Sequence, residues 1–236
     1  MRTNQKIAAW IFILSAFAIQ IPYTYLIVKF NYPQILRQSP ETILTTFKMG
    51  GSTLVMAWWF FGFCGLPLLF SYLVLYEIVK SKNEVVAKLA LLFGILALVF
   101  QLIGLLRWVF VVPILANMLS NSNINPSLKD AVIVSFISIH HLFGVLIGEH
   151  LGQLFTIIWM FLNSSIMKAH EIFGKKLAYF GYIASFLYLL AQAELFSLVI
   201  PEFRKIPLAG LVGSLAWLFW MVFIGISMLR KNSFSK

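Results

Sequence analysis

The chain has 236 residues, of which 61% are hydrophobic and 11% are charged, and its mean hydropathy is +0.90. Soluble domains carry about 25% charged residues, so this composition excludes an ordinary soluble protein. The formal net charge of +10 could suggest nucleic-acid binding. The lysines and arginines lie almost entirely in short segments beside apolar runs, however, and we therefore expect no nucleic-acid partner. The one cysteine, Cys64, excludes an intramolecular disulfide framework.

Six apolar runs are long enough to cross a bilayer, which takes roughly 20 helical residues. We therefore predict an all-α fold, a polytopic membrane helical bundle with six transmembrane helices. No further domain is expected, so residues 1–236 would form a single transmembrane domain in contact with the lipid bilayer. The predicted spans, in chain order, are 7–29, 52–78, 87–117, 131–163, 177–199 and 206–229.

The first predicted span, residues 7–29, has two interpretations. Arg2 and Lys6 precede an apolar run, and Ala16-Phe17-Ala18 is typical of the small-residue cleavage site of a signal peptide. Apolar residues continue past that site to Val28, however, which makes the run long enough to span the membrane. The sequence favours an uncleaved membrane anchor.

The distribution of lysine and arginine predicts the orientation of the spans. Eleven of these residues fall in the N-terminal tail, the second and fourth loops and the C-terminal tail, to which Lys231 and Lys236 belong. Six fall in the first, third and fifth loops. Because cationic residues concentrate on the cytoplasmic side, both termini are predicted to be cytoplasmic. The expected location is the cell membrane, specifically a bacterial plasma membrane.

Arg107 is the remaining cation, and it lies inside the third predicted span. A charge near the bilayer centre costs about 2.5–3.5 kcal/mol, so it normally faces a partner or water. Arg107 is too far from the outer end of its helix to reach the interface fully. Two acids could pair with it. Depth along the spans favours Glu194 in the fifth, while Glu149 in the fourth, or an arginine that bridges both, stays open.

The fourth predicted span contains the polar stretch HHLFGVLIGEHLGQLF, residues 140–155. On a helical wheel at 100° per residue, its glycines at positions 144, 148 and 152 form a ridge that would let another helix approach closely. Glu149 and Gln153 lie on a polar arc beside this ridge, and His150 lies at the edge of the arc. Copies of the chain could also associate through such glycine ridges.

The same wheel predicts which side of the fourth span faces lipid. His140 falls close to that side, and we interpret it as an interfacial residue. The predicted lipid-facing residues are Phe143, Ile147, Leu151, Leu154 and Ile158.

Polar groups on the other spans complete a predicted buried pocket. Gln101 and Arg107 lie on one stripe of the third span with Gly104 between them, and Tyr188 and Gln192 form an i, i+4 pair on the fifth. Gly62, Gly65 and Pro67 predict close packing or a kink in the second span. The predicted ligand-binding residues are Arg107, Glu149, His150, Gln153, Glu194, Gln101 and Gln192.

The segment Arg107-Trp108-Val109-Phe110-Val111-Val112-Pro113, together with Gly148-Glu149-His150-Leu151-Gly152, resembles an uncharacterised family of bacterial six-helix membrane proteins, domain-of-unknown-function family four-three-eight-six. The resemblance covers nearly the whole chain. It implies the six-helix membrane fold and implies no activity, cofactor or catalytic residue.

Three functions fit these observations. In the first, the pocket of Arg107, Glu149, His150 and Glu194 binds or transports an ion or a small polar ligand, because ionisable residues inside membranes mark such sites. In the second, the chain is a membrane-embedded metal-dependent enzyme or redox protein. We expect no metal site, because the candidate ligands His141 and His150 lie on opposite faces of one helix and cannot share a metal. A site that combines either histidine with Glu149 or Glu194 stays geometrically open. In the third, the polar residues are structural contacts between helices.

Overall fold

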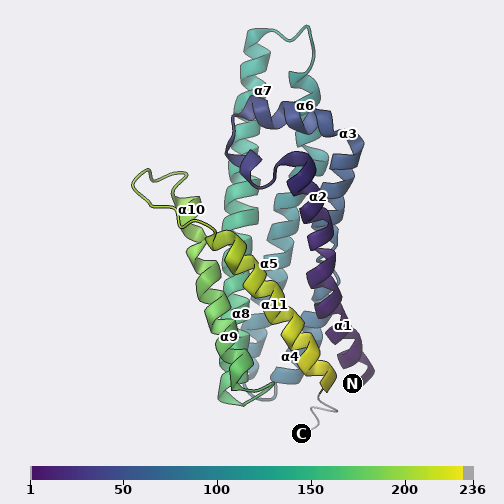
Figure 1. Ribbon diagram of the computed structural model, residues 1–236, viewed down its shortest axis with the longest axis vertical. Helices are drawn as coiled ribbons and strands as arrows, with labels where there is room; N and C mark the ends of the chain where they lie inside the picture. The colour runs from purple at the N-terminus through teal and green to yellow at the C-terminus, as the bar shows by residue number, and fades with distance from the viewer. Residues whose placement is uncertain (1, 231–236) are drawn as a thin grey trace. The chain divides into compact units, whose positions relative to one another are not determined.

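The computed structural model of the protein describes residues 2–230. Residue 1 and residues 231–236, and with them the predicted cytoplasmic charges of Lys231 and Lys236, lie outside the described part. Every regular element that the structure describes is helical, so the all-α prediction is confirmed (Figure 1). The elements are α1 (Arg2–Ala18), α2 (Gln20–Phe30), the 3₁₀ turn η1 (Gln34–Arg37), α3 (Pro40–Phe63), α4 (Leu68–Val79), α5 (Glu84–Phe110), α6 (Val112–Leu119), α7 (Pro126–Ile139), the π-helical stretch η2 (His140–Leu151), α8 (Gly152–Ala169), α9 (Lys175–Leu190), α10 (Gln192–Phe196) and α11 (Ala209–Arg230).

Five helices in the described residues are long and apolar enough to cross a membrane: Arg2–Phe30, Pro40–Val79, Glu84–Leu119, Pro126–Ala169 and Ala209–Arg230. They match five of the six predicted spans, and the chain is a multi-pass membrane protein. The remaining predicted span, residues 177–199, is divided at Ala191 into α9 and α10, and neither part alone has the length to cross.

Prolines explain three of the interruptions within these long helices. A proline cannot donate the i→i−4 hydrogen bond, and its ring collides with the carbonyl of residue i−4. Pro22 follows the break between α1 and α2, Pro113 follows the break between α5 and α6 at Val111, and Pro67 immediately precedes α4. The predicted kink in the second span is confirmed, because helical structure stops between Phe63 and Leu68.

Helix α3 contains a second break, at Gly51, whose φ of 59° and ψ of −157° are non-helical. Only glycine adopts this conformation without strain. The predicted span began at residue 52, directly after the break. The segment from Pro40 to Gly50, which was expected to be loop, is helical and is capped by Ser39, whose hydroxyl accepts from the Thr42 N–H at 3.3 Å.

The chain folds into two compact units. Within the described residues, unit 1 combines residues 2–17, 66–99 and 150–230, and unit 2 combines residues 18–65 and 100–149. Each unit is built from segments far apart in the sequence, and each has its own aromatic core. A single domain over residues 1–236 stays a prediction.

The core of unit 2 is a cluster of aromatic rings, which we call the tryptophan core. Trp58 and Trp108 stack with centroids 4.9 Å apart and an interplanar angle of 11°. Phe30 meets both of them edge-on, and Phe47 stacks on Trp108 at 5.6 Å. Helices α2 and α6 pack against α3, and α6 packs against α7, so that four helices surround these rings.

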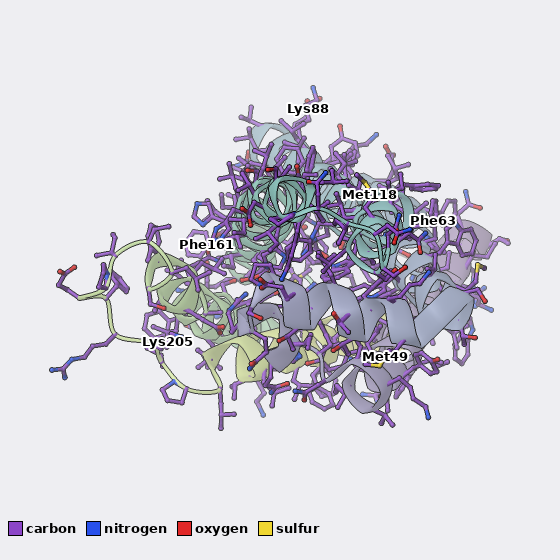
Figure 2. All side chains as sticks on the ribbon, turned by 90° about the horizontal axis from the view of Figure 1, so that it is seen from above. Met49, Phe63, Lys88, Met118, Phe161 and Lys205 are labelled. Carbon is purple, nitrogen blue, oxygen red and sulfur yellow. The ribbon has the colours of Figure 1, made fainter. Side chains whose placement is uncertain are left out.

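In unit 1, helix α9 packs between α8 and α11. Trp159 contacts Tyr72 at 4.3 Å and Trp220 at 5.3 Å between ring centroids. The Trp220 indole N–H donates to the Leu177 carbonyl at 3.1 Å, and an added Cβ at Gly181 would lie 2.6 Å from the same indole nitrogen. The connection from α10 to α11, which includes Lys205, forms a loop that extends away from α9 and α11 (Figures 1 and 2).

The long helices expose apolar side chains. Figure 2 labels three of them, Met49 on α3, Met118 on α6 and Phe161 on α8, which are 75%, 38% and 51% exposed. Large contiguous apolar surface is unfavourable in water and marks a surface that faces lipid or another protein. This exposure agrees with a membrane protein whose helices face lipid.

Candidate functional site

Arg107 on α5 is buried in unit 2, with 6% of its surface exposed. Its Nη1 group donates to the Gly104 carbonyl one turn earlier, and its guanidinium carbon lies 5.1 Å from the centroid of the Trp108 ring. Within the described residues of unit 2, Arg107 forms no ion pair within 4.0 Å, and its Nε–H has no hydrogen-bond partner. A guanidinium is always charged and offers five donors, so this burial leaves donors unmatched.

Glycines make room for this guanidinium. A Cβ added at Gly144 would lie 2.5 Å from Nη2 and 3.1 Å from Nε of Arg107. One turn further along, Gly148 faces Gly104, and a Cβ added at Gly104 would lie 2.6 Å from the Gly148 Cα. The predicted ridge of close approach is therefore confirmed at Gly144 and Gly148, and its partner is α5 of the same chain.

Glu149, on the same stretch η2, binds a cation that the sequence analysis assigned to a loop. The Nη2 of Arg37 donates to the Glu149 carboxylate at 3.2 Å, and the two side chains are 23% and 20% exposed. Arg37 is held there because Ile35 and Leu36, which precede it in η1, are buried in the core of unit 2. Sequence reasoning missed Arg37, since nothing in its local pattern distinguishes it from a loop cation that sets topology.

The structure brings Arg107 close to one of the two acids that could pair with it. Glu149 lies within electrostatic reach of Arg107 in unit 2, and so does Arg37. Glu194, which the depth argument favoured, lies on α10 in unit 1, where the Ser197 hydroxyl donates to its backbone carbonyl at 2.6 Å. Pairing of Arg107 with Glu194 stays a prediction.

His140 is not interfacial, and that prediction was wrong. The side chain is 6% exposed, and its ring stacks on Phe136 at 5.4 Å and meets Trp108 edge-on at 6.3 Å. Its Nδ1 has no hydrogen-bond partner in the described residues, and Arg107 lies within electrostatic reach. Arg107 and His140 thus both border Trp108 with an unpartnered nitrogen.

The wheel assumed an α-helix, whereas residues 140–151 are π-helical. A π-helix bonds residue i to i+5 and therefore turns less per residue than the 100° that the wheel assumed. The angular error therefore grows with distance along η2. In the structure His141, Leu142 and Leu146 are exposed, and the predicted lipid-facing residues are half-buried: Phe143, Ile147, Leu151, Leu154 and Ile158.

Three predicted site residues meet in unit 1 as a hydrogen-bonded chain. The Nδ1 of His150 lies 2.6 Å from the Oε1 of Gln192, and the Nε2 of Gln192 donates to the Oε1 of Gln153 at 2.9 Å. Because Gln192 accepts through Oε1, the His150 proton lies on Nδ1. The break at Ala191 positions buried Gln192 between the other two. The remaining predicted residue, Gln101 on α5, is half-buried in unit 2.

A cavity of about 190 Å³ lies in unit 2 beside the break in α3. Phe47, Lys48, Gly51 and Asn117 are among the residues that line it, and the Lys48 ammonium donates to the Asn117 side-chain oxygen. Phe47 also stacks on Trp108, which links the cavity wall to the ring that Arg107 and His140 border. No acidic residue is among those that line the cavity.

A model of the family described as Domain of unknown function (DUF4386) matches residues 7–225. The chain belongs to this family. No curated protein and no solved structure matches the chain. Membership in the DUF4386 family agrees with the resemblance seen in the two segments around Arg107 and Glu149, and it assigns no activity to them.

The described residues around Arg107 include charged side chains that can bind an ion, but they do not form a metal site of three ligands. Among the described residues, no three histidine, cysteine, aspartate or glutamate side chains lie close enough to hold a metal ion. The candidate ligands are separately engaged: Glu149 binds Arg37, and His150 binds Gln192. His141 is exposed, and the centroid of its ring lies 6.0 Å from that of His140. The polar centre of unit 2 is therefore the cluster of Arg37, Arg107 and Glu149, which we call the arginine cluster.

Proposed function

We propose that this chain binds or transports an ion or a small polar ligand at the arginine cluster of unit 2. One observation carries the proposal: Arg107 is buried in a membrane protein and forms no ion pair with the described residues of unit 2. A buried charge of this kind normally marks a substrate or ion pathway. One carbonyl and one aromatic ring leave most of its donors unmatched, so a ligand has groups to bind.

Part of the arginine cluster is accessible from the protein surface. Arg107 is almost fully buried, while Arg37 and Glu149 remain about one-fifth exposed. A ligand that displaces one contact of the Arg37–Glu149 pair would reach the buried guanidinium. One hydrogen bond of the pair runs from Nη2 of Arg37 to the Glu149 carboxylate at 3.2 Å.

A thermal-shift experiment on the purified protein in detergent tests the proposal. The probes are sodium, potassium and ammonium salts, acetate, inorganic phosphate and neutral polyols. We expect at least one probe to raise Tm by about 5 °C at saturation, because binding to the folded state alone stabilises it. Arg107→Met should abolish that shift. The matched control Arg204→Met changes an exposed loop residue and should retain it. An equal shift in Arg107→Met, or no shift with any probe, would reject the proposal.

A structural function is the second candidate, and the His150–Gln192–Gln153 chain in unit 1 favours it for those residues. Polar contacts between membrane helices contribute about 0.6 kcal/mol each on average. Gln192→Leu should therefore lower Tm without changing the ligand-dependent shift. Residues that serve binding behave in the opposite way, since they can often be replaced with little loss of stability.

We further propose six spans, with both termini in the cytoplasm of a bacterium and the chain in its plasma membrane. The charge distribution supports the orientation. For the sixth crossing, α9 has 16 residues and α10 has 5, and together they reach the roughly 20 residues that a span requires.

Labelling of single cysteines in intact cells tests this topology. In a Cys64→Ser background, Ser122→Cys and Glu202→Cys should react with a membrane-impermeant maleimide, because both loops are expected outside. Ser81→Cys should react only after the cells are permeabilised. If Glu202→Cys behaves like Ser81→Cys, the segment from α9 to α10 does not cross the membrane, and the six-span proposal fails.

A further inference from the structure

We infer that the ligand of the arginine cluster is a small, singly charged oxyanion, held by the Nε–Nη2 edge of Arg107 beside Gly144. The inference rests on the proposed function and specifies the chemical class of its ligand. It follows from which atoms of the cluster lack partners, from the sign of the surrounding charges and from the packing of Gly144 against the guanidinium.

The atoms without partners are hydrogen-bond donors. The Nη1 of Arg107 already donates to the Gly104 carbonyl. This leaves the opposite edge, with Nε and Nη2, which is the edge that binds carboxylate and phosphate oxygens in a bidentate manner. Nε has no partner in the described residues. A guanidinium has no acceptor atom, so only a group with lone pairs can complete this edge.

His140 provides a second unpartnered nitrogen in the same place. Its Nδ1 is buried without a partner, its ring borders Trp108 as Arg107 does, and Arg107 lies within electrostatic reach of it. A neutral imidazole donates from one ring nitrogen, so His140 can add one N–H bond to an oxygen of the ligand.

The charges near Arg107 favour an anion over a cation. Arg37 and Arg107 lie within electrostatic reach of each other, and the carboxylate of Glu149 is bound to Arg37. A cation at the Nε–Nη2 edge would be repelled by the guanidinium it touches, whereas an oxyanion would be attracted.

Gly144 packs against the face of the Arg107 guanidinium. A Cβ at this position would lie 2.5 Å from Nη2, 2.7 Å from Cζ and 3.1 Å from Nε. An atom that is closer to Cζ than to Nε lies above the guanidinium plane, whereas an oxygen bound to the Nε–Nη2 edge lies in that plane. A side chain at residue 144 would therefore push the guanidinium away and displace the edge that holds the ligand.

The same oxyanion chemistry has two sources, a free acid and the phosphodiester of an anionic lipid headgroup. The protein is therefore placed in nanodiscs of phosphatidylcholine, with or without phosphatidylglycerol. Sodium acetate and inorganic phosphate are titrated against sodium chloride at equal ionic strength, and Tm is measured. We expect acetate or phosphate to raise Tm in phosphatidylcholine discs if the source is a free acid. If the source is a lipid, phosphatidylglycerol should raise Tm, and acetate should then add nothing further.

Three variants test the assignment to this edge. Gly144→Ala should abolish the shift, because its Cβ would displace the guanidinium, while Gly210→Ala should retain it, because the nearest atom to an added Cβ there is 4.0 Å away. Glu149→Gln should tighten oxyanion binding by about tenfold, because a competing carboxylate is removed. Where Gly144→Ala yields no monodisperse protein, Arg107→Lys replaces it, and oxyanion affinity should fall about tenfold because lysine lacks the bidentate edge.

The outcomes separate this inference from the proposed function. If a cation raises Tm and Glu149→Gln abolishes that effect, the cluster binds a ligand and the oxyanion assignment is wrong. If Gly144→Ala binds oxyanions as tightly as the unaltered protein, the edge of Arg107 is not the site. If no probe of either sign binds, both the inference and the proposed function fail.

Discussion

Replacing Trp108 with alanine is expected to lower the free energy of unfolding by about 3–5 kcal/mol, which is typical for removal of a buried tryptophan. Trp108 is 0% exposed, and it stacks on Trp58 at 4.9 Å and contacts Phe30 and Phe47. These rings come from α2, α3 and α5, so the cavity would open at the point where three helices meet. Arg107 would also lose the ring that its guanidinium contacts.

The measurement is unfolding of the purified protein in detergent, by heat and by denaturant. Trp59→Ala is the matched control, since this neighbour of Trp58 is 39% exposed and its removal leaves no buried cavity. The control should change the unfolding free energy by about 1 kcal/mol or less. Equal losses in the two variants would mean that the tryptophan core does not stabilise unit 2 as its packing indicates.

Gly104→Ala is expected to have the second-largest effect, a loss of about 1–3 kcal/mol from overpacking. The added Cβ would lie 2.6 Å from the Gly148 Cα and 2.9 Å from the Phe143 carbonyl oxygen. Both are backbone atoms, which cannot rotate away as a side chain would. Helix α5 must therefore separate from η2, and the Gly104 carbonyl that accepts from Arg107 moves with it.

The same unfolding measurement, with Gly210→Ala as control, checks this prediction. Gly210 is also helical, but an added Cβ would meet nothing closer than the Ala191 Cβ at 4.0 Å. Alanine has the higher helix propensity, so the control should be neutral or slightly stabilising. If Gly104→Ala were equally harmless, the close approach of the two backbones would not exist in the folded protein.

The glycine ridge on the fourth span illustrates what sequence could predict about the site. Spacing by four residues placed Gly144 and Gly148 on one face, and both do contact α5. The position of His140 was wrong, since this side chain is buried. His140 stacks on Phe136 and meets Trp108 edge-on, and the contact with Trp108 joins segments that no local pattern brings together.

Arg37 illustrates the other limit. Charge counting assigned it correctly to the connection between the first two spans, but counting cannot say where a connection folds. Burial of Ile35 and Leu36 against distant helices places the arginine beside Glu149, more than one hundred positions away in the chain. The comparison of depths in the membrane included only residues within the predicted spans. Arg37 lies between two spans and was therefore not compared with either acid.

The amino-acid sequence alone identifies an all-α membrane protein of the DUF4386 family with a charge inside its third span. Those conclusions depend on composition, on the lengths of apolar runs and on the cost of placing a charge in lipid, all of which are properties of the chain read locally. Which groups meet Arg107 could be learned from the folded protein alone. Such contacts arise from the packing of helices far apart in sequence, where Gly144 leaves room for the guanidinium and the Trp108 ring centroid lies 5.1 Å from its central carbon.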